Sequence, residues 1–413
     1  MIKRDIKDSI VKSLALKEVT IITGARQVGK TTILKEIIAD LKIKANKVLY
    51  FNLDIEEDSK HFSSQQQLLN KIELEVGRDK AFIFIDEIQQ KEDVGRFLKG
   101  IYDMDLPYKF IVTGSGSIEL KEKISEALTG RKYLIEMKPV SFVEFVNYKT
   151  HYKYKNRLDK YFAIEKEQSR LLLDEYLAFG GYPAVITADT VTRKQEIMNE
   201  VFVSYITKDI SFLLGVRYPD KFVKLIKLLA VQSGGIINYS QLAQDTGIRT
   251  ETLKTFLWYA EQTFIIKIVK PFFSNPKKEL TKSPTIYFND LGMLNFSNNS
   301  FTGEPNRGMV FQNFVFLVLE SRFSKGLQKI NYWRTKDKAE VDFIVHSKDG
   351  VVPVEVKQKE MKKMEITRSF RSFLSTYNPQ KAFVINLDYE SFERIEDTNV
   401  HIIPFWHLFS IEI

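Results

Sequence analysis

One short segment limits the folds open to this chain more than any other. Residues 24–31 read Gly-Ala-Arg-Gln-Val-Gly-Lys-Thr; an apolar run precedes them at residues 19–23, and helical periodicity follows at residues 31–41. A strand, a glycine-containing turn and a helix in this order open a βαβ unit, which requires a parallel sheet. The spacing G-x-x-x-x-G-K-T is typical of a phosphate-binding loop, in which backbone N–H groups surround phosphate oxygens at the start of a helix.

Three more apolar runs continue the alternation of strands and helices. They lie at residues 48–53, 81–85 and 110–113, and the run at 81–85 is apolar throughout, as expected of a strand buried on both faces. Residues 1–150 are therefore predicted to form an α/β domain with a parallel sheet and helices on both sides.

The acidic pair after residues 81–85 supplies the second half of a nucleotide site. Lys30 would reach the β- and γ-phosphates of ATP, and the hydroxyl of Thr31 would ligate Mg²⁺. Asp86 would hold the same Mg²⁺, and Glu87 suits the orientation and deprotonation of an attacking water. The sequence thus predicts ATP and Mg²⁺ as cofactors. The residues expected to contact the nucleotide are Gly24, Ala25, Arg26, Gln27, Val28, Gly29, Lys30, Thr31 and Thr32.

Two further positions are candidates for catalytic roles. Residues 110–117 are an apolar run that ends in small polar residues, and Thr113 or Ser115 could bond the γ-phosphate or the attacking water. An ordinary strand-ending turn is the alternative. Arg131 follows a loop glycine and could stabilise charge on the transferred phosphoryl group, or it could be an ordinary surface arginine.

The rest of the chain divides into three regions by pattern. Residues 151–233 are mainly helical and are predicted to be a lid or linker region, and residues 301–413 are predicted to be a second α/β unit. Residues 234–300 show two short helices followed by two strands, the order of a winged helix-turn-helix. Its second helix could enter a DNA groove, with Lys277 and Lys278 near phosphates, or the module could bind protein only.

Charged residues alternate along two adjacent strands of the last region. Glu340 and Asp342 share one strand face, and Glu355 and Lys357 share a face of the next. If these strands form a hairpin, two acids and a lysine converge, which is an arrangement that binds Mg²⁺ and positions a water or a phosphate. Charged strand faces without catalysis are the alternative.

Composition excludes several other kinds of site. The chain of 413 residues has no cysteine, so disulfides, thiolate zinc sites and cysteine nucleophiles are excluded, and its five histidines show no ligand spacing. The net charge of +8 is a mild bias toward polyanions. The amino-terminal residues 1–14 are expected to form an amphipathic helix rather than a signal peptide, and cytoplasmic residence is expected by default.

Several motifs together resemble a large prokaryotic family of AAA-type ATPases. In the first half the resemblance is carried by GARQVGKTT, FIFIDEIQ, VTGSGS, LTGR and KPVSFVEF. In the second half it is carried by LAFGGYPAV, ITKDI, WRTKDKAEVDFIV and VPVEVK. The resemblance implies the usual ATPase roles for Lys30, Thr31, Asp86 and Glu87, with Ser115 as the sensor and Arg131 as a charge-stabilising arginine.

The same resemblance implies a restriction-endonuclease-like fold for residues 301–413. Asp342, Glu355 and Lys357 then match the D…(E)xK pattern of such nucleases. Gln312 departs from that pattern, because related chains commonly carry a glutamate there. Since Gln312 has no charge, metal affinity should fall.

The sequence leaves two functions open. In the first, an ATPase couples hydrolysis to the binding or processing of DNA or RNA. In the second, a nucleotide-dependent switch or scaffold binds protein partners, including further copies of the chain, and its nuclease-like domain is inactive. Neither function involves a membrane.

Overall fold

A computed structural model provides the structure of the protein. It describes residues 1–115, 127–205, 219–273, 282–301, 303, 306–323, 329–348, 350–361, 363 and 365–413.

The amino-terminal part is built on a five-stranded sheet, as far as the described residues show, in the order β2-β3-β4-β1-β5. Every neighbouring pair in this sheet is parallel. The strands are β1 (Val19–Gly24), β2 (Val48–Asn52), β3 (Ala81–Asp86), β4 (Tyr108–Ser115) and β5 (Lys132–Glu136). Because the strands are parallel, the carboxyl ends of β1, β3 and β4 meet at one end of the sheet, its carboxyl-terminal edge.

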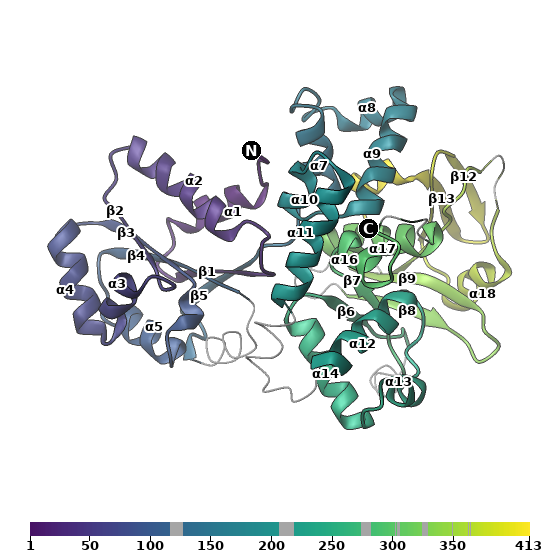
Figure 1. The fold of residues 1–413 in the computed structure, drawn as a ribbon. Coiled ribbons are helices and arrows are strands. Elements are labelled where there is room, and N and C mark those ends of the chain that lie inside the picture. Colours follow the sequence, from purple (N-terminus) through teal and green to yellow (C-terminus); the bar gives the residue numbers. More distant parts are fainter. Residues whose placement is uncertain are drawn as a thin grey trace.

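Helices cover both faces of this sheet, as the sequence predicts (Figure 1). Alternate side chains of the strands pack into two separate apolar clusters, with Ile22 on one side and Ile21 on the other. The first face is covered by α1 (Ile6–Ser13) and α2 (Lys30–Ile43). The second is covered by α4 (Gln65–Val76) and α5 (Val94–Asp103), with the short α3 (Glu56–Ser59) beside them.

The middle part is helical over its described residues. Its helices are α7 (Phe142–Lys149), α8 (Leu158–Ile164), α9 (Lys166–Phe179), α10 (Pro183–Thr187), α11 (Val191–Ser204) and α12 (Pro219–Val231). The turn between α9 and α10 requires glycine. Gly180 has φ +72°, and a Cβ there would stand 2.4 Å from the backbone nitrogen of Gly292.

Two helices and a hairpin follow, in the order expected of residues 234–300. The helices are α13 (Tyr239–Thr246) and α14 (Thr250–Gln262), joined through Gly247 in a left-handed conformation. The antiparallel strands are β6 (Ile266–Val269) and β7 (Thr285–Phe288), and α16 (Leu291–Ser297) comes next.

The carboxyl-terminal part has a six-stranded sheet, within the described residues, in the order β12-β13-β11-β10-β9-β8. Strands β8 to β10 form an antiparallel meander, whereas β10, β11 and β13 are parallel neighbours. Helix α17 packs against β8 to β10, and α18 contacts β9. The elements are α17 (Arg307–Phe323), β8 (Ile330–Arg334), β9 (Glu340–Ser347), β10 (Gly350–Val356), α18 (Arg368–Tyr377), β11 (Lys381–Asn386), β12 (Ser391–Ile395) and β13 (Thr398–Pro404).

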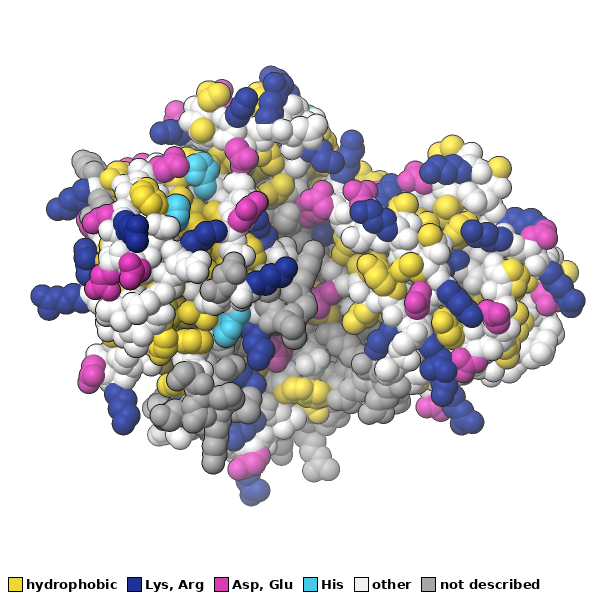
Figure 2. Space-filling view, turned by 180° about the vertical axis from the view of Figure 1, so that it is seen from behind, with side chains coloured by type: hydrophobic (Ala, Val, Ile, Leu, Met, Phe, Trp, Pro, Cys, Tyr) yellow, Lys and Arg dark blue, Asp and Glu magenta, His cyan; other side chains and the backbone are white. Residues whose placement is uncertain are grey.

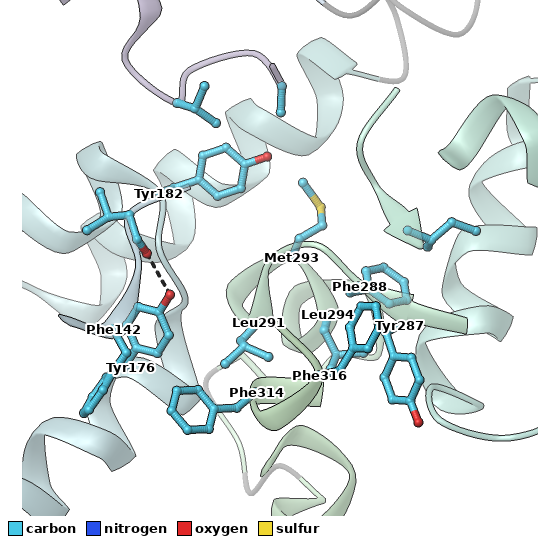
Figure 3. Packing of buried hydrophobic residues seen from close by; sticks show 14 of the residues in the cluster. Phe142, Tyr176, Tyr182, Tyr287, Phe288, Leu291, Met293, Leu294, Phe314 and Phe316 are labelled. Carbon is cyan, nitrogen blue, oxygen red and sulfur yellow. Dashed lines mark hydrogen bonds between the residues drawn. The ribbon is translucent and has the colours of Figure 1, made fainter. Parts of the chain in front are cut away.

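The middle and carboxyl-terminal parts share one apolar core. Phe142 of α7 lies edge-on to Tyr176 of α9 and to Phe314 of α17, with ring centroids 5.4 Å and 5.5 Å away (Figure 3). Aromatic pairs in this geometry stabilise the packing beyond the area that they bury. These segments are therefore held together by a continuous interior.

Basic side chains do not gather in one patch on the face shown in Figure 2. Lysine and arginine side chains are interspersed there with acidic ones. Among the described residues, no helix is both long and apolar enough to cross a membrane.

Candidate functional site

The loop after β1 has the backbone geometry of a phosphate-binding loop. Gly24 has φ +155°, and a Cβ there would lie 2.2 Å from the carbonyl oxygen of Met137. Gly29, with φ +99°, is the N-cap of α2. Glycine is needed at both positions, because any other residue would clash or be strained. Gln27 also has a positive φ of 61°, so the chain turns sharply into the amino-terminal end of α2.

Side chains of the loop divide between anchoring and exposure. Ala25 and Val28 are buried in the same cluster as α2, while Arg26 is half-buried and Gln27 is exposed. The Lys30 ammonium is buried and donates to the carbonyl oxygens of Gly24, at 3.0 Å, and Ala25, at 2.9 Å. Lys30 therefore lies over the loop, as its sequence position predicts.

Asp86 stands at the carboxyl end of β3 and accepts hydrogen bonds from three hydroxyl groups. Thr31 donates at 2.7 Å and Tyr50 at 3.0 Å to Oδ2, and Thr113 donates to Oδ1. Asp86 is only 1% exposed, so these bonds replace the water that a carboxylate would otherwise bind. Burial, followed by the nearby Asp86 carboxylate, raises the pKa of Tyr50, which therefore stays a protonated donor.

Glu87 follows Asp86 in a left-handed conformation, with φ 57° and ψ 44°. Its backbone nitrogen donates to the Thr113 hydroxyl at 3.3 Å, and its carboxylate accepts from the Gln89 amide. A glutamate in this region of backbone space is strained, and such strain persists where surrounding contacts hold it. Thr113 therefore connects the Asp86 carboxylate to the backbone of Glu87, while Gln89 contacts the Glu87 carboxylate.

These contacts bring Lys30, Thr31, Asp86 and Glu87 to one edge of the sheet. The backbone of Ser115, at the end of β4, pairs in register with Gly24; its side chain lies outside what the structure describes. Thr113, the alternative to Ser115, is the residue seen to bond the acidic pair. Thr32 is exposed in the first turn of α2.

Arg131 is not brought to this edge. It directly precedes β5, whose Lys132 pairs with Val19 at the amino-terminal end of β1. Because β1 and β5 are parallel, Arg131 lies at the amino-terminal end of the strands, whereas the loop lies at their carboxyl-terminal end. Its guanidinium Nε contacts Asp103 Oδ1 at 2.8 Å. The expectation that Arg131 stabilises charge at its own chain's site is therefore not met by this arrangement.

The residues present fit a magnesium-bound nucleotide. The Thr31 hydroxyl donates its hydrogen bond to Asp86, so the lone pairs of the Thr31 oxygen remain available to a cation. Oδ1 of Asp86, which accepts from Thr113, keeps a further lone pair, whereas Oδ2 already accepts from Thr31 and Tyr50. Carboxylate and hydroxyl oxygens are ligands that Mg²⁺ accepts. The glycine turns and Lys30 suit the phosphates of ATP. Sequence reasoning missed Tyr50, because a tyrosine in an apolar strand gives no signal apart from its neighbours.

A second polar group lies in the carboxyl-terminal sheet, where β9 and β10 form the expected hairpin. Asp342 Oδ1 accepts from Gln312 Nε2 of α17 at 2.7 Å, and its Oδ2 accepts from the backbone nitrogen of Val356, also at 2.7 Å. The Gln312 amide also donates to the hydroxyl of Tyr287 at 3.2 Å. Gln312 therefore faces Asp342.

Glu355 on β10, and Lys357 directly after the end of β10, lie close enough to Asp342 to act on its charge. Lys357 Nζ lies 2.7 Å from Glu355 Oε1. Burial is the main cause that raises the pKa of Asp342, and the Glu355 carboxylate adds to it. Burial likewise raises the pKa of Glu355. The structure thus brings the predicted acids and lysine together, in surroundings where burial raises the pKa of both acids.

A cavity of about 190 Å³ opens beside Asp342. Gln312, Glu340 and Arg334 line it together with the backbone of Gly234 and Gly235. Among the described residues, no cluster of three or more histidine, aspartate or glutamate side chains could hold a metal ion. Glu320, a further acid on α17, contacts Lys138, which follows β5.

The helix-turn-helix candidate exposes part of its second helix. Thr252 and Lys254 are exposed on α14, and Lys254 also lies 5.8 Å from the ring centre of Tyr239. The lysines expected near phosphates, Lys277 and Lys278, lie outside the described residues.

Three family models match successive parts of the chain. Residues 16–146 match an AAA domain. Residues 170–302 and 307–408 match two separate domains of unknown function.

Similar proteins add little about function. An uncharacterized protein of Methanocaldococcus jannaschii is 26% identical and covers 98% of this chain and 90% of its own length. One of Haemophilus influenzae is 25% identical over 82% of each chain. Among solved structures, the replication initiator DnaA bound to AMPPCP and single-stranded DNA aligns with a TM-score of 0.29 and 13% identity, covering 63% of this chain and 90% of that chain. A structure described under katanin self-assembly aligns with a TM-score of 0.26 and 16% identity, covering 36% and 56%.

The family match and the fold agree for the first part of the chain. Residues 16–146 cover the parallel sheet and the loop at its edge, and the match supports an AAA-type ATPase family with ATP binding as its implied property.

Proposed function

We propose that this protein is a Mg²⁺-dependent ATPase whose site is formed by Lys30, Thr31, Asp86 and Glu87. The observation that carries the proposal is the hydrogen-bond network at the sheet edge. One buried carboxylate, Asp86, accepts from Thr31 of the phosphate loop and from Thr113, and the Thr113 hydroxyl also accepts from the backbone nitrogen of Glu87.

The roles of the residues follow from their chemistry. Mg²⁺, held by Thr31 and Asp86, would supply positive charge that draws electrons from the γ-phosphate. Lys30 neutralises charge on the β- and γ-phosphates. Glu87 accepts a proton from water while the water oxygen bonds to the γ-phosphorus and the bond from that phosphorus to the β–γ bridging oxygen breaks, releasing ADP and phosphate.

We propose further that hydrolysis is coupled to nucleic acid. Support comes from the acids and lysine that converge beside Asp342 and from the exposed start of α14. The alternative is a switch that binds protein partners. Turnover stimulated by DNA or RNA favours the first, and turnover indifferent to both, with no binding at low salt, favours the second.

A nuclease role for the last domain is a second candidate. The topology of a helix, three antiparallel strands, a helix and a parallel strand supports it, as does the nearness of the Glu355 carboxylate to Asp342. Since Gln312 is uncharged and burial raises the pKa of Asp342 and Glu355, cleavage should be absent or slow in Mg²⁺ and more visible in Mn²⁺.

The test uses circular and single-stranded DNA and RNA with ATP and either metal. Gln312→Glu should increase cleavage, and Asp342→Ala should abolish it. No cleavage by the wild type or by Gln312→Glu would leave this domain a binding module.

A further inference from the structure

Arg4 makes a set of contacts that connects the phosphate loop to the segment after β5. Its Nη1 donates to the carbonyl oxygen of Val28 at 2.9 Å. Its Nη2 donates to the carbonyl oxygens of Lys138, at 2.6 Å, and Pro139, at 3.3 Å. Its Nε donates to Glu144 at 3.2 Å. The guanidinium therefore bridges the loop and residues 138–144 of the chain.

Both charged side chains of this contact are buried. The Arg4 side chain is 10% exposed and that of Glu144 is 7% exposed. A buried guanidinium is costly unless its donors are satisfied and its charge is paired. Here three backbone carbonyls and one carboxylate provide for both, so the orientation of Arg4 is fixed.

Residues 138–144, which anchor Arg4 on the side away from the loop, are themselves held by several hydrogen bonds. Glu144 closes a capping box with Ser141 at the start of α7 and also accepts from the backbone nitrogen of Asp5 at 2.8 Å. Val140 receives a hydrogen bond from the Tyr176 hydroxyl at 2.7 Å, drawn as a dashed line from Tyr176 in Figure 3. The backbone nitrogen of Val140 donates to the carbonyl oxygen of Gly181 at 2.8 Å. The anchor is therefore a rigid support for Arg4.

The contact with Val28 determines the orientation of one peptide group of the loop. The carbonyl of Val28 and the N–H of Gly29 belong to the same planar trans peptide, so they point in opposite directions. With the carbonyl bonded to Arg4, the Gly29 N–H points away from Arg4. Gly29 is the N-cap of α2, where backbone N–H groups serve anions.

A second effect acts on the same peptide group. A cationic donor on a carbonyl polarises the whole peptide and strengthens the hydrogen bond that its N–H can give. Without Arg4, the carbonyl of Val28 loses its cationic partner, and any turn of that carbonyl toward the phosphates would bring oxygen against oxygen.

We propose that Arg4 is a positioning residue of the nucleotide site: it holds the Val28–Gly29 peptide so that the Gly29 N–H faces the phosphates. This inference rests on the proposed function, because it requires that the loop binds ATP. It concerns groups that ATP and ADP share, so Arg4 supports binding of both nucleotides and has little part in the chemical step.

The experiment compares nucleotide affinity and turnover in Arg4→Ala, Arg4→Lys and the wild type. We expect the Kd for ADP and the KM for ATP to rise together, by about tenfold in Arg4→Ala, since a charge-assisted hydrogen bond is lost. Arg4→Lys, which keeps the charge but not the planar fork, should fall between. The kcat should stay within about threefold, because the lost interaction serves ground state and transition state alike.

A matched control separates this role from simple attachment of the first residues. The Tyr152 hydroxyl accepts from the backbone nitrogen of Lys3 at 2.7 Å, one residue away from Arg4. Tyr152→Phe removes that attachment and leaves the Arg4 contacts in place. It should lower the thermal midpoint without changing the Kd for ADP.

The outcomes distinguish this inference from the proposed function. A wild type that binds neither ATP nor ADP overturns the proposed function, and the inference falls with it. Wild-type binding with an unchanged Kd in folded Arg4→Lys or Arg4→Ala overturns the inference alone, as does a loss of kcat with an unchanged KM. Should Arg4→Ala fail to fold, Arg4→Lys decides by the same readings.

Discussion

The hydroxyl of Thr31 lies 2.7 Å from Oδ2 of Asp86, so a residue of the phosphate loop and a residue 55 positions later are directly bonded. This contact joins the start of α2 to the end of β3. It places the two expected Mg²⁺ ligands side by side, one in the first turn of a helix and the other at the last residue of a buried strand.

Thr113 should matter for turnover more than Tyr50, although each donates one hydrogen bond to Asp86. Thr113→Val removes that donor and also the acceptor for the Glu87 backbone nitrogen, so the backbone of Glu87 loses a contact that holds it next to Asp86. Tyr50→Phe removes a donor only. We expect kcat to fall about tenfold or more in Thr113→Val and by less in Tyr50→Phe, with Thr113→Ser near the wild type. Steady-state ATPase kinetics measure the difference, and equal losses in the two variants would remove Thr113 from this role.

Gly180 and Gly130 offer a matched pair for a prediction about stability. Their φ angles are +72° and +73°, but a Cβ at Gly180 would stand 2.4 Å from Gly292 N and 2.5 Å from Asp290 Oδ1, whereas nothing lies within 4 Å at Gly130. Gly130→Ala should cost about 1 kcal/mol, the usual strain of this backbone region. Gly180→Ala should cost more than about 3 kcal/mol, because backbone atoms must also move. Thermal unfolding of both variants checks this, and equal midpoints would contradict the packing described around Gly180.

Asp342 should make stability depend on pH. Its folded-state pKa is raised, first by burial and then by Glu355, so the native state holds a proton that the unfolded chain releases. The stability that this group contributes is therefore lost as the pH rises from about 4, the ordinary value for aspartate, through the raised pKa. Asp342→Asn removes this dependence and can still accept from Val356, so its thermal midpoint should gain on the wild type between pH 5 and pH 8.

Asp397, 88% exposed, provides the control for that prediction. Asp397→Asn should run parallel to the wild type over the same range of pH. A constant difference between Asp342→Asn and the wild type at all pH values would show that Asp342 titrates normally.

Much of the nucleotide-site fold could be predicted, because its strands are long, apolar and buried on both faces. The expected strands at 19–23, 48–53, 81–85 and 110–113 correspond to β1 to β4. The strand β5 (Lys132–Glu136) was missed. It is an outer strand of the sheet, and only Ile135 among its side chains is buried, so its hydrophobic pattern is weak. Strand β12 was missed for a similar reason, since it has no buried side chain. Strand β13 was missed although most of its residues are buried.

The candidate site likewise has residues that the sequence predicts and residues that only the folded chain reveals. Lys30, Thr31, Asp86 and Glu87 follow from local spacing, which a sequence displays directly. Arg131 illustrates the limit of that reasoning, because its distance from the loop depends on where β5 joins the sheet. Arg4 carries no local signal either; its contacts reach 24 to 140 residues along the chain, and only the folded chain brings them together.

Comparison of Glu87→Gln with the wild type tests the central claim most directly. Both proteins are assayed for binding of ATP and for release of phosphate in Mg²⁺. The substitution removes the carboxylate that takes the proton from water and leaves Thr31, Asp86 and Lys30 unchanged. We expect ATP affinity within about threefold of the wild type and a kcat lower by about 100-fold or more. Wild-type turnover in Glu87→Gln would contradict the account.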